Sequence, residues 1–185
     1  MLLSRRAVKV FSVALLFLSM TVAVSAQNIA ELKKQATAGD AKAQYNLGVA
    51  YANGYGVPED EAEAVRWWRK AADQGNANAQ YRLGVSYSLG QGVGKDGAEA
   101  ARWYRKAADQ GKLDAQFMVG MAYSTGEGVV KDETEAYFWL NLGAALDDTA
   151  KKARDKVGES LTPEKRLEIQ ERCRKWAEEH SQAHK

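Results

Sequence analysis

The sequence predicts an all-α protein in which pairs of helices stack into a solenoid. A segment of 36 residues occurs three times without a gap, at 39–74, 75–110 and 111–146. The first two copies are identical at 24 of 36 positions, and 13 positions are the same in all three copies. A fixed period in this range is typical of repeat proteins, in which each repeat is one supersecondary unit that buries its apolar face against its neighbours.

Each repeat contains two stretches of helical periodicity. In AKAQYNLGVAY (41–51) and AEAVRWWRKAA (62–72), apolar residues recur every three or four positions, the spacing that gives a helix one buried face. We therefore expect a first helix and a second helix in every repeat. The large aromatic residue at Trp67, Trp103 and Trp139 is expected to fill the space between successive layers.

A glycine-rich loop joins the two helices of each repeat. Its three copies are GYGVPED (54–60), GQGVGKD (90–96) and GEGVVKD (126–132). A phosphate-binding loop occurs once, follows a strand, and carries a lysine and a hydroxyl residue at fixed positions. This loop recurs three times, follows a helical stretch and lacks that spacing, so its glycines are interpreted as bends that the repeat requires.

Each second helix begins with the spacing of a capping box. A glutamate follows three residues after Asp60, Asp96 and Asp132. We expect each aspartate to accept hydrogen bonds from first-turn amides, and each glutamate to reach back to the aspartate amide. The glycine that begins each repeat falls where a helix C-terminus favours a left-handed residue. The positions assigned to the repeat structure are Gly48, Gly54, Gly56, Trp67, Gly84, Gly90, Gly92, Trp103, Gly120, Gly126, Gly128 and Trp139.

The first 26 residues have the composition of a secretory signal peptide. Three basic residues precede an apolar run of 15 residues, and Val24-Ser25-Ala26 is a small-residue cleavage site. That run is shorter than the ~20 residues a membrane-spanning helix needs. We therefore expect cleavage after Ala26 and a periplasmic or secreted location. Removal of the leader changes the formal net charge from +2 to −1, which leaves no overall attraction to nucleic acid.

The shared pattern AQYxLGxxYxxGxGVxxDxxEAxxWxRKAAxQG resembles the Sel1-like repeat, a longer relative of the tetratricopeptide repeat. The third copy departs from it after Trp139, where LNLGAAL replaces YRKAADQ. The resemblance implies a right-handed α/α solenoid with a capping helix at 27–38 and capping helices at 147–185. Thr162 and Pro163 are expected to begin the closing helix. Residues 150–180 are expected to cover the unusually apolar second helix of the third repeat, which carries Phe138 and Leu142.

Other clusters favour structural roles. The carboxylates around Asp60 could serve a hydrolase, but capping explains both their type and their spacing. His180 and His184 stand four residues apart without a third ligand at matching spacing, so no metal site is predicted. Cys173, the one cysteine, is expected in the core on a helical face with Ile169, Trp176 and Ala177.

Two surfaces could carry function. The basic residues of the second helices, at 66, 69, 70, 102, 105 and 106, are expected to form a solvated face balanced by Glu63 and Glu99. On the first helices, one stripe at i, i+4, i+7 and i+11 varies between the copies. This variable stripe consists of Lys42, Asn46, Val49 and Asn53; Asn78, Arg82, Val85 and Leu89; and Asp114, Met118, Met121 and Thr125.

By the resemblance, first helices line the concave surface of such a stack, so the variable stripe is the candidate binding groove. Methionines suit an adaptable contact surface. A plain solvated face is the alternative, although Val49, Val85 and Leu89 are unusual choices for contact with water.

These observations predict an exported scaffold or regulator that binds another envelope protein, or a peptide segment of one, in its groove. We expect no catalytic residue, cofactor or metal, no nucleic acid partner, and no membrane insertion once the leader is removed. The alternative is an envelope enzyme, or a glycan- or β-lactam-binding protein, related to cysteine-rich Sel1-like proteins. The paired cysteines of those relatives are absent from this sequence.

Overall fold

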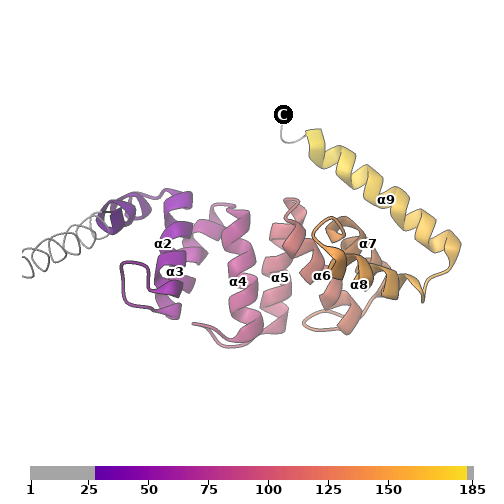
Figure 1. Ribbon diagram of the computed structural model, residues 1–185, viewed down its shortest axis with the longest axis horizontal. Coiled ribbons are helices and arrows are strands. Elements are labelled where there is room, and N and C mark those ends of the chain that lie inside the picture. The colour runs from indigo at the N-terminus through magenta and orange to yellow at the C-terminus, as the bar shows by residue number, and fades with distance from the viewer. Residues whose placement is uncertain (1–27, 183–185) are drawn as a thin grey trace, which may run out of the picture.

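The computed structural model describes residues 28–182, which form a right-handed solenoid of helix pairs and contain no strand (Figure 1). The predicted fold class is confirmed. A short helical segment at 28–37 precedes α2 (Ala41–Asn53), α3 (Glu61–Asp73), α4 (Ala77–Leu89), α5 (Gly97–Asp109), α6 (Leu113–Thr125), α7 (Glu133–Gly143), α8 (Asp148–Gly158) and α9 (Pro163–Gln182). The predicted leader lies outside the described residues. Within them, no helix combines the length and the apolar character that crossing a membrane requires.

The aspartate caps form as predicted, but the glutamates act differently. Asp60 accepts a hydrogen bond from the Glu63 amide at 3.0 Å, and the other two capping aspartates make the equivalent bond. The Asp60 amide donates to the Tyr51 carbonyl at 2.9 Å, so it already has an acceptor. Glu63 instead pairs with Arg66 at 2.5 Å. The prediction that the glutamate reaches back was wrong, because the loop had already satisfied the amide.

Glycine at the centre of each first helix allows the paired helices to touch. A Cβ atom added at Gly84 would lie 2.4 Å from the Tyr104 ring, and one at Gly48 would lie 2.5 Å from the Trp68 ring. The second glycine of the loop makes a closer approach. A Cβ atom at Gly92, whose φ is +66°, would lie 2.2 Å from the Glu61 carbonyl oxygen of the preceding repeat. The Gly-x-Gly loops are therefore bends, as predicted, and they also stack one repeat on the next.

The aromatic layer differs from the prediction at the N-terminal end. Trp103 and Trp139 are buried, whereas Trp67 is half-buried and its neighbour Trp68 is buried instead. Only the short segment 28–37 precedes the first repeat in the described part of the chain, and its Leu32 packs, like Trp67, against the small cluster of Ala36, Ala43 and Leu47. A full preceding repeat would cover the indole on both sides.

A buried glutamine links each repeat to the one before it. Gln80 is 5% exposed, and its Nε2 donates to the Ala72 carbonyl at the end of α3 at 3.1 Å. Gln44 and Gln116 make the same bond to the carbonyls of Ala36 and Ala108. Each of these carbonyls also accepts from the amide of the glycine three residues further on, as Ala72 does from Gly75 at 2.9 Å. The glutamine therefore adds a second hydrogen bond, and this bond joins one layer of the stack to the next.

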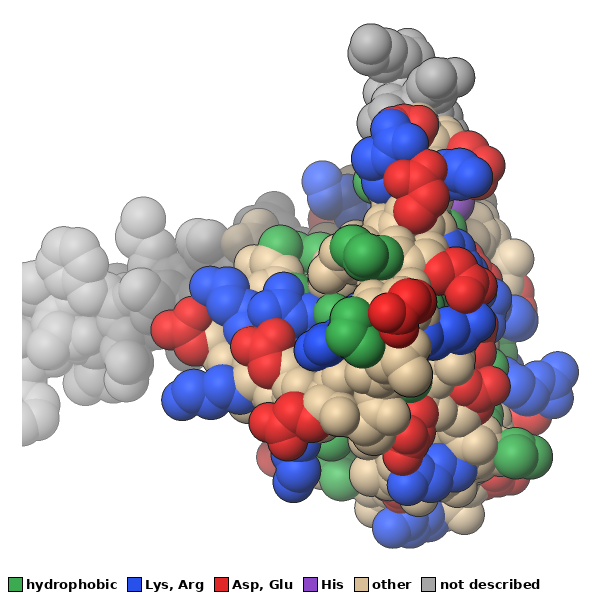
Figure 2. Space-filling model, turned by 90° about the vertical axis from the view of Figure 1, so that its right-hand side faces the viewer, with side chains coloured by type: hydrophobic (Ala, Val, Ile, Leu, Met, Phe, Trp, Pro, Cys, Tyr) green, Lys and Arg blue, Asp and Glu red, His purple; other side chains and the backbone are tan. Residues whose placement is uncertain are grey.

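The C-terminal helices cover the last repeat, as predicted. Thr162 Oγ1 accepts from the Lys165 amide at 3.2 Å, and α9 begins at Pro163. Phe138 of α7 packs with Ile169 and Cys173 of α9, and all three side chains are buried. Ala177, predicted on the same face, is exposed. Figure 2 views this end of the molecule and shows basic and acidic side chains interspersed over it.

Candidate binding surface

The variable stripe lies on the surface, and none of its residues is fully buried. Met118 and Met121 are half-buried, as are Val49, Val85 and Asp114. Leu89 is 63% exposed, which is unusual for a large apolar side chain. The remaining residues of the stripe are also exposed: Lys42, Asn46, Asn53, Asn78, Arg82 and Thr125.

The structure gathers part of the stripe into a hollow between α4, α5 and α6, here called the methionine hollow. Its volume is about 300 Å³, and its lining includes Gly97, Tyr104, Met118, Met121 and Thr125. The lining is mainly apolar, with Glu127 as its one charged residue. This is the size and character of a surface that accepts one or two apolar side chains of a partner.

A second hollow lies at the equivalent place one repeat earlier. It is half the size, about 150 Å³, and its lining includes Asn53, Glu61, Trp68, Arg82 and Val85. The Arg82 guanidinium lies 6.0 Å from the centre of the Trp68 ring, so it covers the aromatic floor. The methionine hollow is larger because glycine and methionine, at 97 and 118, replace glutamate and arginine at 61 and 82.

The structure thus divides the stripe instead of forming one uniform groove. Seven residues of the stripe line a hollow. The smaller one is lined by Val49, Asn53, Arg82 and Val85, and the larger by Met118, Met121 and Thr125. The other five candidates line neither: Lys42, Asn46, Asn78, Leu89 and Asp114.

Two polar members of the stripe already bond to their own helices. Asn53 Nδ2 donates to the Val49 carbonyl at 2.8 Å, and Thr125 Oγ1 donates to the Met121 carbonyl at 3.0 Å. The methionine hollow therefore offers mainly apolar contact.

Tyr104 contributes a polar hydroxyl group to the otherwise mainly apolar methionine hollow. Its Oη lies 3.3 Å from Ser88 Oγ, and either oxygen can donate. Burial raises the pKa of Tyr104 to about 12, so the phenol stays neutral at physiological pH. Tyr104 was not predicted as a site residue, because its position reads as core in the repeat pattern.

The basic face of the second helices is only partly as predicted. Arg66 and Arg102 pair with Glu63 and Glu99, at 2.5 Å and 2.6 Å. Other cations instead lie over tryptophan rings: Lys70 over Trp67 at 4.1 Å, Lys106 over Trp103 at 3.9 Å, and Arg105 over Trp139 at 4.5 Å. These side chains lie over indole faces and remain exposed to solvent, so the face is solvated as predicted.

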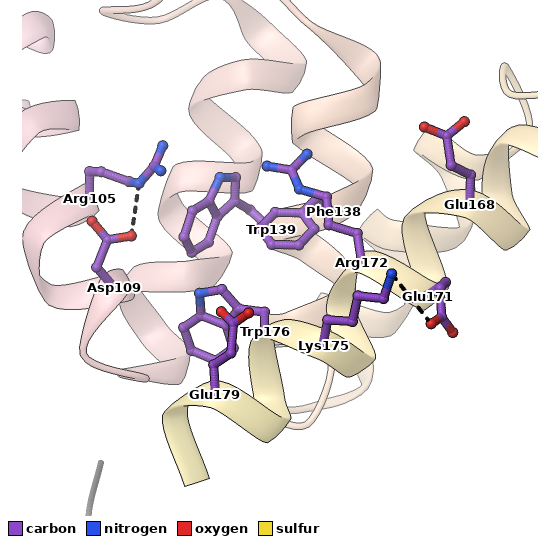
Figure 3. A pocket seen from close by; sticks show the side chains of 10 residues that line it. All are labelled: Arg105, Asp109, Phe138, Trp139, Glu168, Glu171, Arg172, Lys175, Trp176 and Glu179. Carbon is purple, nitrogen blue, oxygen red and sulfur yellow. Dashed lines mark hydrogen bonds and ion pairs between the residues drawn. The ribbon is translucent and has the colours of Figure 1, made fainter. Parts of the chain in front are cut away.

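A third hollow, of about 510 Å³, opens between α5, α7 and α9 (Figure 3). Trp139 and Trp176 meet edge to face with their centroids 6.5 Å apart. Around them, Arg105 pairs with Asp109 at 2.9 Å, and Lys175 lies 3.8 Å from Glu171. Acidic and basic side chains both stand around this hollow, so its charge favours neither an anionic nor a cationic ligand.

Residues with catalytic or metal-binding potential are not brought together. In the part of the chain that the structure describes, no three His, Cys, Asp or Glu side chains form a group that could hold a metal ion. His180 stacks on Trp176 with the ring centroids 3.7 Å apart, and His184 lies outside the described residues. Cys173 Sγ lies 3.6 Å from the Phe138 carbonyl oxygen, and burial raises the pKa of its thiol. A raised pKa disfavours the thiolate that a nucleophile requires.

The Sel1 repeat family matches residues 41–76, 77–112 and 113–148. Among solved structures, c5321, a protective antigen present in uropathogenic Escherichia coli strains that displays an SLR fold, is 34% identical over 83% of this chain, with a TM-score of 0.74. The chain spans only 33% of that protein. A Sel1 repeat protein from Oxalobacter formigenes is 40% identical, over 70% of this chain and 98% of its own, with a TM-score of 0.65.

Helicobacter pylori cysteine rich protein B shares the fold, at 24% identity over 67% of this chain and 95% of its own, with a TM-score of 0.54. No curated protein matches the chain. The three matched repeats span more than half of the sequence. The chain therefore belongs to the Sel1 repeat family, whose members typically act as scaffolds for protein–protein interaction and are generally not catalytic.

Proposed function

We propose that the protein is an exported scaffold that holds an extended or helical segment of another cell-envelope protein. An apolar side chain of that segment inserts into the methionine hollow. The observation that carries this proposal is the hollow itself. Met118 and Met121 line it at positions that vary between repeats, while positions needed for the stack are occupied by repeating residues.

The chemistry of the hollow supports a protein partner. Methionine is unbranched and polarizable, so it adapts to side chains of different shape. Binding energy at protein interfaces concentrates in a few central apolar or aromatic anchors that fill pockets. A rigid stack of helices also keeps the hollow preformed, which lowers the entropy lost on binding.

Export rests on the leader. We propose that cleavage after Ala26 releases the chain into the periplasm or the medium, where the partner would also reside. N-terminal sequencing of the exported protein should begin at Gln27, whereas a start at Met1 in the membrane fraction would contradict the proposal.

The binding proposal is tested by site-specific photo-cross-linking in the producing cell. A benzophenone amino acid placed at Met121 should give one dominant cross-linked envelope protein, identified by mass spectrometry. The same amino acid at Arg66, exposed on a second helix, serves as the control and should not give that product. A partner captured equally from both positions would place binding outside the methionine hollow.

A further inference from the structure

We propose a second binding site, behind the methionine hollow, that takes an acidic peptide segment with an aliphatic side chain between carboxylates. This cationic hollow has a volume of about 420 Å³, and its lining includes Arg102, Arg105, Lys106, Val119 and Tyr123. Ala101 and Ala122 line both hollows, so the contact between α5 and α6 separates them. The site goes beyond the proposed function, which does not depend on it.

The hollow is open because the side chain of Arg105 has a different hydrogen-bond partner from that of Arg69, its counterpart in the preceding repeat. In the preceding repeat, Arg69 donates a hydrogen bond to Tyr87 Oη and lies 5.6 Å from the centre of that ring. Arg105 occupies the equivalent position. Both arginines lie near the tryptophan of the next repeat, Arg69 at 5.7 Å from the Trp103 ring centre and Arg105 at 4.5 Å from that of Trp139. Arg105 differs because it donates to Asp109 at 2.9 Å instead of to a tyrosine. The wall formed by Tyr123, the counterpart of Tyr87, is therefore left without a guanidinium across it.

The charge around this hollow has one sign. Three cations line it and no carboxylate does. Arg102 and Arg105 have acidic partners, but each pair is open to solvent on at least one side. Arg102 is 73% exposed, and Arg105 and Asp109 are 44% and 49% exposed. Ion pairs in contact with solvent contribute little to stability. Lys106 lies over Trp103 and, within residues 28–182, has no carboxylate partner. An incoming carboxylate can thus accept charge-assisted hydrogen bonds from the Lys106 ammonium group and from the guanidinium groups of Arg102 and Arg105.

The apolar floor of the cationic hollow indicates that the ligand also carries an aliphatic side chain. Val119 is buried, and the side chains of Tyr123 and Val129 are half-buried beside it. A purely anionic chain would leave this apolar surface in contact with water. A segment of the type Glu-Leu-Glu satisfies both features, because the leucine covers the floor while the two carboxylates reach the arginines and Lys106.

The test uses an acetylated and amidated Gly-Glu-Leu-Glu-Gly peptide, titrated into the isotope-labelled protein and followed by NMR. Saturable shifts of the Val119 and Val129 methyl signals are expected. A peptide with glutamines in place of the glutamates, and a peptide with alanine in place of leucine, should each bind about tenfold more weakly.

The protein variant that tests the site is Arg102→Gln with Lys106→Gln, which should lower the affinity about tenfold. Its matched control is Arg66→Gln with Lys70→Gln. This pair removes the same charge and the same kinds of contact at equivalent positions, where Arg69 lies across the tyrosine. The control should bind like the parent protein, and so should Met121→Ala, because Met121 lines the methionine hollow and not the cationic one.

Four outcomes would overturn the proposal. The first is the absence of saturable shifts at Val119 and Val129. The second is an equal loss of affinity in the two double variants, which would indicate general charge attraction. The third is a variant peptide that binds as tightly as the original one. For the alanine peptide this would show that the apolar floor is not required, and for the glutamine peptide that the cations are not required. The fourth is loss of binding in Met121→Ala, which would assign the peptide to the methionine hollow and equally refute the second site.

Discussion

Gln110 Nε2 donates a hydrogen bond to Gln80 Oε1 at 2.7 Å, although the two residues stand 30 positions apart. Gln80 in turn donates to the carbonyl of Ala72, so one buried side chain joins three helices. Gln74 and Gln44 form the same pair one repeat earlier, also at 2.7 Å. The stack is therefore held between its layers by directional bonds as well as by apolar packing.

Replacement of Gln80 by methionine should destabilise the array. The change keeps the length of the side chain but removes the hydrogen bonds to the Ala72 carbonyl and from the Gln110 amide. Both groups keep another partner, because the Ala72 carbonyl accepts from the Gly75 amide at 2.9 Å and Gln110 Nε2 lies 3.5 Å from the Lys106 carbonyl oxygen. The expected cost is therefore that of lost hydrogen bonds, about 0.5–1.5 kcal/mol. Urea-induced unfolding followed by circular dichroism should show that loss, whereas Gln91→Met, at an exposed loop position, should change the free energy of unfolding by less than about 0.5 kcal/mol. Equal stability of the two variants would show that the glutamine bond is dispensable.

Gly84→Ala should also lower the free energy of unfolding. Its new methyl group would overlap the Tyr104 ring, and overpacking of this kind costs about 1–3 kcal/mol. Gly94→Ala is the control, because an added Cβ atom there meets nothing within 4 Å. It should be neutral or stabilising by up to about 1 kcal/mol. Thermal melts of both variants would settle the comparison, and a stable Gly84→Ala protein would show that the helices separate easily.

Alkaline pH should lower the free energy of unfolding of the parent protein more than that of the Tyr104→Phe variant. Burial raises the pKa of Tyr104 to about 12 from an ordinary value of 10.0. The phenol therefore contributes its full stability below pH 10, and the contribution is lost as pH rises through 12, because the unfolded chain ionises first. At pH 11 the loss relative to pH 8 is about 1.4 kcal/mol. The phenylalanine variant should lack this component, and parallel curves for the two proteins would contradict the assignment.

The C-terminal cover should depend on Ile169. Ile169→Ala removes a fully buried side chain that packs against α7, at a cost of about 2–5 kcal/mol. Cys173, four residues further along α9, should then react faster with a thiol reagent such as dithiobisnitrobenzoate. Leu167→Ala, at a side chain that is 66% exposed, is the control and should change neither stability nor thiol reactivity. Unchanged reactivity in Ile169→Ala would mean that α9 does not protect the thiol.

The repeat pattern predicted the helices and their caps because local spacing determines both. It did not assign a role to Gln44, Gln80 and Gln116, because their acceptors lie at the end of the preceding helix, a relationship in space that a single helix pattern does not contain. It also misplaced the buried indole of the first repeat at Trp67, since that position repeats while the neighbouring Trp68 does not.

The binding surface was only partly predictable. The variable stripe indicated Met118 and Met121, but the opening of the methionine hollow depends as much on Gly97, which lies on α5. That glycine stands where the other repeats carry Glu61 and Glu133. Its effect becomes visible only when the two helices are packed together.

Gly97→Glu is the most direct test of the account, because it restores the residue found in the other two repeats and should obstruct the methionine hollow. A Cβ atom at Gly97 meets neighbouring atoms only at ordinary contact distance, 3.4 Å or more, and an acidic residue in the first turn favours the helix. The variant should therefore stay folded.

The measurement is the yield of the cross-link formed from a benzophenone at Met121, compared between Gly97→Glu and Gly94→Glu. The second variant adds the same charge in a loop position that does not line the hollow. We predict that Gly97→Glu abolishes the cross-link while Gly94→Glu retains it. A folded Gly97→Glu protein that cross-links as well as the parent would contradict binding in the methionine hollow.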